Sequence, residues 1–61
     1  MTLKAIVVDD EDLARKNLTM LLHEYCSGVQ VIGDAGNITT AKEKIEELKP
    51  DVVFLDIRMP S

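Results

Sequence analysis

The sequence predicts an α/β fold in which three strands of a parallel sheet alternate with two helices. The near-continuous apolar run of residues 3–8 is typical of a strand buried on both faces, and residues 29–35 and 52–55 are two further strand candidates. Between them, residues 12–25 and 38–48 repeat apolar side chains at helical spacing. Because strand, helix and strand follow one another with short connections, the strands should be parallel and joined by helical crossovers, and an order 2-1-3 is compatible with this pattern.

The first expected helix has an apolar stripe and clear boundaries. Asp12 either caps the helix or places a favourable charge in its first turn, and Gly28 should help to end it. Arg15 is expected to lie off the stripe. The stripe consists of Ala14, Leu18, Leu21, Leu22 and Tyr25.

The second expected helix has two candidate starting points. Asn37 can cap it, and a capping box that begins at Thr40 is the alternative. Pro50 cannot continue a helix and disfavours helical geometry at Lys49, so the helix should end there.

Composition limits the range of functions. The net charge is −4, which argues against a nucleic-acid interface formed by this segment, and no apolar run is long enough for a membrane span or signal peptide. The single cysteine, Cys26, excludes an intrachain disulfide and fits a cytoplasmic location. At 61 residues the chain is expected to form one domain of marginal stability.

Acidic residues follow two of the expected strands. Asp9 and Asp10 come after the first strand, and Asp56 comes after the third. If the strands are parallel and these two are neighbours, the three carboxylates lie at the same carboxyl edge, where open α/β sheets bind ligands. Each aspartate taken alone is equally well explained as a turn residue, so only the combination predicts a site.

Three carboxylates in one place repel one another unless a cation joins them. Oxygen ligands of this kind, with room for water, suit Mg²⁺. A carboxylate can also attack phosphorus and form an aspartyl phosphate. An EF-hand is excluded because the acidic segment lacks the alternating ligands and the glycine of that loop. A haloacid dehalogenase-like phosphatase is excluded because Arg58 stands where a second acid is needed.

The motifs "IVVDDE" (residues 6–11) and "KPDVVFLDIRMP" (residues 49–60) resemble the receiver domain of bacterial two-component response regulators. The resemblance covers the whole chain and implies the first half of a flavodoxin-like, doubly wound sheet. A weaker similarity to regulators with a LytTR-type DNA-binding output lies in "DAGN" and "DIRMP".

The resemblance also implies roles for individual positions. Asp56 matches the phosphoacceptor, which receives phosphate from a sensor histidine kinase. Asp10 matches a direct Mg²⁺ ligand, Asp9 a ligand acting through water, and Arg58 the residue whose backbone carbonyl completes the metal site. The module accepts phosphate rather than acting as an enzyme in its own right.

The sequence departs from the family by covering only the first three strands and two helices, and it lacks the phosphate-binding lysine and the switch residues. We therefore expect residues 1–61 to behave as a truncated receiver domain with impaired phosphorylation. The bare third strand should pair with another chain, as a homodimer or by element swapping. The alternative is a half-domain that self-associates, keeps an acidic metal site and does not signal.

Overall fold

The computed structural model describes residues 1–56 and contains five elements in the order β-α-β-α-β. They are β1 (Leu3–Asp9), α1 (Asp12–Tyr25), β2 (Val29–Ala35), α2 (Ile38–Leu48) and β3 (Val52–Asp56). The three strands are parallel and ordered β2-β1-β3. This confirms the predicted α/β class and the strand order, and it matches the first half of a flavodoxin-like sheet.

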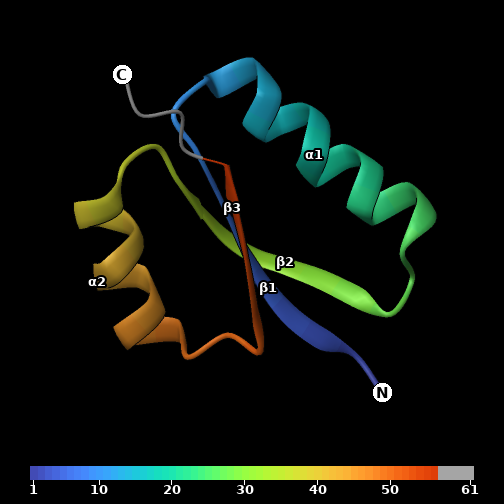
Figure 1. Cartoon of the computed structure of the whole chain (residues 1–61). Helices are drawn as coiled ribbons and strands as arrows, with labels where there is room; N and C mark the ends of the chain where they lie inside the picture. The colour runs from blue at the N-terminus through green and yellow to red at the C-terminus, as the bar shows by residue number, and fades with distance from the viewer. Residues whose placement is uncertain (57–61) are drawn as a thin grey trace.

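The sheet separates the two helices, with α1 on one face and α2 on the other (Figure 1). Both helices pack against β1 and β2, and within residues 1–56 neither packs against β3. The core accordingly centres on the middle strand, where Ala5, Ile6, Val7 and Val8 are completely or almost completely buried. Ile6 and Val8 face α2 and contact a cluster that includes Ala41.

Strand β2 pairs with β1 through an irregular register. Ala5 is paired with Val31, but the next residue, Ile6, is paired with Gly33, so Ile32 is an extra residue in β2. This β-bulge lets the half-buried side chain of Ile32 pack against the α2-side core. The bulge was not predicted, although Gly33 beside it is a residue type that often marks a bulge inside a strand.

The structure confirms one of the two starting points for α2. Asn37 is the N-cap, and its side-chain oxygen accepts a hydrogen bond of 2.8 Å from the backbone N–H of Thr40. The helix therefore begins before Thr40, and the alternative capping box is not used. Lys49 ends the helix in a left-handed conformation (φ 48°), which confirms that the residue before Pro50 leaves helical geometry.

The predicted range of α1, residues 12–25, is confirmed, and of the two roles expected for Asp12 the first-turn charge is the one found, since the N-cap is Glu11. The expected glycine cap is wrong, because the C-cap is Cys26 and Gly28 is not left-handed. Two members of the predicted stripe, Leu21 and Tyr25, are 52% and 76% exposed. The face of α1 that meets the sheet carries Leu18, Leu22 and Arg15. The helix is therefore rotated relative to the predicted apolar stripe.

Candidate functional site

Asp9 lies at the carboxyl end of the central strand and is the one buried charged residue described. Its side chain is 5% exposed because β1 is flanked by a strand on each side and covered by helices. Its Oδ1 accepts a hydrogen bond of 2.9 Å from the backbone N–H of Glu11. The carboxylate is therefore held against the turn that leads into α1.

The register of the sheet places Asp56 beside Asp9. The two residues are partners in the parallel pairing of β1 with β3, so their backbones lie ~5 Å apart. Partners in parallel strands point to the same face, which here is the α1 face, opposite Ile6 and Val8. Asp10 follows Asp9 directly and is exposed. The structure thus brings two of the predicted site residues side by side and puts the third next to them.

The donor set suits a divalent cation, but the described side chains do not form a ready-made metal cluster. Within residues 1–56, no three His, Cys, Asp or Glu side chains gather in a way that could hold a metal ion. Mg²⁺ usually takes only one or two carboxylates together with water and phosphate oxygens, so the adjacent pair Asp9 and Asp56 is compatible with it. The predicted fourth ligand, the carbonyl of Arg58, lies outside the described residues.

Arg15 is the site residue that reading the sequence missed. Its side chain is 17% exposed and reaches from α1 across the ends of β1 and β2. Nη1 donates a 2.8 Å hydrogen bond to the backbone carbonyl of Asp9, and Nε donates one of 2.9 Å to Asp34 Oδ2. Nη2 donates a 2.6 Å hydrogen bond to Asp12 Oδ1. One guanidinium therefore connects the first turn of α1 with both strand ends.

The hydrogen bond that the Arg15 guanidinium donates to Asp34 is the largest cause that raises its pKa. Burial opposes this rise, and the hydrogen bond to Asp12 adds to it. Asp34 also forms an ion pair with Lys44 of α2, whose Nζ lies 3.9 Å from Asp34 Oδ1. Four elements consequently meet around these charges. In the sequence, only the expected sheet topology indicates that these charges meet, because it brings the end of β2 next to the start of α1.

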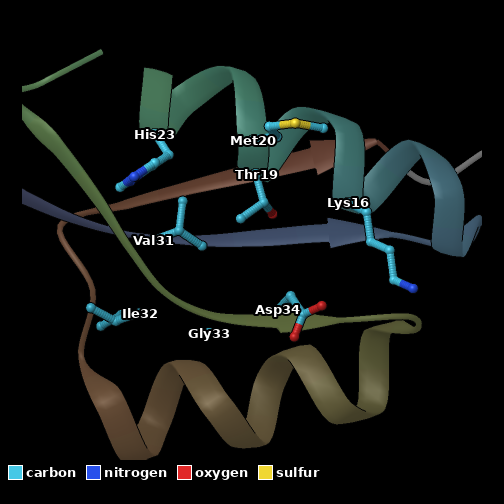
Figure 2. A pocket seen from close by; sticks show the side chains of 8 residues that line it. All are labelled: Lys16, Thr19, Met20, His23, Val31, Ile32, Gly33 and Asp34. Carbon is cyan, nitrogen blue, oxygen red and sulfur yellow. The ribbon is translucent and has the colours of Figure 1, made fainter. Parts of the chain in front are cut away.

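A groove of about 560 Å³ runs along β2 beneath α1 (Figure 2). Lys16 and Asp34 lie toward one end of it and His23 toward the other. His23 is exposed, as expected for a surface histidine. Asp9 and Asp56 do not line this groove, so it is separate from the acidic edge.

A half of a doubly wound sheet, with paired acids at the carboxyl ends of its neighbouring strands, defines an α/β domain whose site lies at that edge. Comparison with known families assigns residues 5–61 to the response regulator receiver domain, and the chain belongs to this family. The resemblance seen in the sequence is thereby confirmed.

Individual relatives agree with this assignment. The chain is 59% identical over 58 residues to an uncharacterized response regulatory protein of Vibrio vulnificus and 43% identical over 58 residues to the transcriptional regulatory protein BtsR of Escherichia coli. Each alignment covers 95% of this chain and 24% of the relative. The chain therefore spans about a quarter of the length of the curated relatives it matches. Among residues 1–56, no helix is long and apolar enough to cross a membrane.

Proposed function

We propose that this chain is a phosphoacceptor module in which Asp56 receives a phosphoryl group from a sensor histidine kinase. The observation that carries the proposal is the pairing of Asp56 with the buried Asp9 at the carboxyl edge of the sheet. Asp56 itself is exposed, so a phosphorylated partner can reach its carboxylate. Membership of the receiver family supports the same role.

In the proposed reaction a carboxylate oxygen of Asp56 attacks the phosphorus of a phosphohistidine. The new O–P bond forms as the P–N bond breaks, and the electron pair returns to the imidazole nitrogen, which takes up a proton. Asp9, Asp10, Asp56 and the backbone carbonyl of Arg58 would hold Mg²⁺. When bound, the cation would neutralise the negative charge that the carboxylate and the phosphoryl group share. The chain serves as the acceptor, and the kinase supplies the enzymatic activity.

Incubation with Mg²⁺ and acetyl phosphate, followed by intact mass measurement, tests the proposal. We expect a gain of one phosphoryl group in low yield, with no gain in Asp56→Asn. Asp51→Asn is the matched control, because Asp51 lies at the opposite edge of the sheet, beside Lys4. A gain that survives in Asp56→Asn would exclude Asp56 as the acceptor.

The second candidate function is a half-domain that self-associates and does not signal. It is supported by β3, which is the last strand of the sheet within residues 1–56 and carries Leu55 with 61% of its side chain exposed. Pairing of this edge with a second copy, as a homodimer or by exchange of elements, would cover it. A complete absence of phosphorylation in the mass experiment would favour this candidate over the first.

For the longer protein that such a module serves, we propose regulation of transcription in the cytoplasm. One relative is named as a transcriptional regulatory protein, and the present chain matches only 24% of it. The remaining length of such a protein has room for an output domain, for which the weak LytTR-type similarity suggests DNA binding. Comparing DNA binding by the longer protein with and without phosphorylation at Asp56 tests this.

A further inference from the structure

Arg15 binds the backbone between Asp9 and Asp10, two of the proposed metal ligands. The carbonyl that accepts its Nη1 hydrogen bond belongs to Asp9 and is part of the peptide group that joins Asp9 to Asp10. The Asp9 carboxylate is held separately by the N–H of Glu11. With both ends of Asp9 fixed, the orientation of the next peptide plane is fixed as well. The Glu11 N–H belongs to the peptide group after Asp10, so the peptide planes on both sides of Asp10 are held, and together they restrict the direction in which its exposed side chain leaves the chain.

The guanidinium is itself fixed from several directions. Its Nε and Nη2 donate to Asp34 and Asp12, so none of its three nitrogens is left without an acceptor. Two carboxylates that approach a planar guanidinium restrict its rotation far more than they would restrict a lysine ammonium. Arg15 is therefore a rigid connection between Asp34 at the end of β2 and Asp9 at the end of β1.

Gly36 provides the space that this arrangement needs. A Cβ at position 36 would lie 3.0 Å from the Arg15 Nη1 and 4.0 Å from the Asp9 carbonyl oxygen. Any side chain there would push against the nitrogen that donates to Asp9. Because Gly36 has a negative φ, the requirement for glycine comes from this close approach rather than from backbone conformation.

We propose that Arg15 is a positioning residue that orients Asp9 and Asp10 for cation binding, with Gly36 as the residue that keeps its place open. The proposal rests on the proposed function, since it takes the acidic edge as a Mg²⁺ site. Asp34 and Asp12 pair with the guanidinium, so its positive charge is offset in part and its repulsion of a nearby cation is weakened.

The test is the Mg²⁺ affinity of Arg15→Gln, followed through amide NMR shifts of residues 9, 10 and 56. Removing a positive charge near a cation site should by itself strengthen Mg²⁺ binding, because a like charge is lost. The positioning role predicts the opposite sign, a weakening of about 10-fold, the usual effect of losing a group that orients a metal ligand. Lys16→Gln is the charge-matched control and should bind Mg²⁺ as the parent chain does, or more tightly.

A second pair of variants tests the same role without changing charge and decides the matter if Arg15→Gln does not fold. Gly36→Ala should weaken Mg²⁺ binding and shift the Asp10 amide even without metal, whereas Gly28→Ala, where the added carbon meets nothing within 4 Å, should do neither. Mg²⁺ affinity in Arg15→Gln equal to that in Lys16→Gln, or unchanged affinity in Gly36→Ala, overturns the proposal. Failure of the parent chain to bind Mg²⁺ at residues 9, 10 and 56 overturns the proposed function itself, and the two failures are thus distinguishable.

Discussion

At the scale of single residues, Asn37 has the most sharply defined structural role. Its side chain satisfies the backbone N–H of Thr40 in the first turn of α2, one of the donors that has no partner within the helix. Asn37→Ala should lower the free energy of unfolding by about 1 kcal/mol, as is usual for the loss of a cap, and Asn37→Ser should cost little. Urea denaturation measures both, and equal destabilisation by the two variants would show that the loss does not come from the cap.

Arg15 gives a prediction about pH. Its pKa is raised in the folded state, so its contribution to stability is fully present below the arginine pKa of the unfolded chain, which lies far above pH 9, and is lost only as pH rises through the still higher folded-state pKa. The destabilisation caused by Arg15→Gln should therefore be the same at pH 7 and pH 9. Denaturant unfolding at both values checks this, and a destabilisation that differs clearly between the two pH values would contradict it.

The candidate site was partly predictable because its acids follow recognisable strands. Parallel pairing of residues 3–8 with residues 52–55 was enough to place Asp9 near Asp56. Arg15 could not be found in the same way. Its main partner, Asp34, is 19 residues away along the chain, and its charge suggested an outward position. A long side chain whose stem lies along the sheet while its guanidinium meets carboxylates has no local signature.

At the scale of elements, Asp51 joins β1 to β3 at the amino edge of the sheet. Its carboxylate accepts a 2.9 Å hydrogen bond from the N–H of Lys4, and its own N–H donates one of 2.8 Å to the Lys4 carbonyl. Asp51→Ala removes the first bond and should cost about 0.5–1 kcal/mol, while Asp51→Asn keeps an acceptor and should cost less. Faster amide hydrogen exchange at Lys4 in Asp51→Ala, but not in Asp51→Asn, is the expected readout; equal exchange in the two would disprove the role of the carboxylate.

The elements themselves were largely predictable, whereas their rotation was not. Continuous apolar runs identify the strands, and the range of α1 follows from its helical period. The period does not say which part of a wide apolar stripe meets the sheet. In the structure Leu22 is buried while Leu21 and Tyr25 are exposed, because contact with β1 and β2 reaches only one side of the stripe. Helix α2 behaves similarly, with Ala41 buried and Ile38 56% exposed.

At the scale of the whole molecule, neither helix packs against β3 within residues 1–56, so this strand is left uncovered. An apolar groove of about 380 Å³ lies between α2 and β3, and Val8, Ile45, Val53 and Leu55 are among the residues that line it. Leu55 and Val53 point toward α2, yet α2 does not pack against β3. Burial of such surface is the main favourable term in association, so a partner surface at this groove would be stabilising.

The 61-residue chain should therefore self-associate through β3. Leu55→Lys places a charge on the exposed strand and should shift the chain toward monomer in sedimentation at micromolar concentration, because a lysine on an edge strand opposes pairing with another chain. Leu13→Lys is the matched control, since Leu13 is 73% exposed on α1, a helix that does not pack against β3 within residues 1–56, and should leave association unchanged. Equal loss of association in both variants would show that the interface does not lie at β3. A parent chain that sediments as a compact monomer and unfolds cooperatively would show instead that the two helices and β1 bury enough apolar surface to keep an uncovered β3 folded.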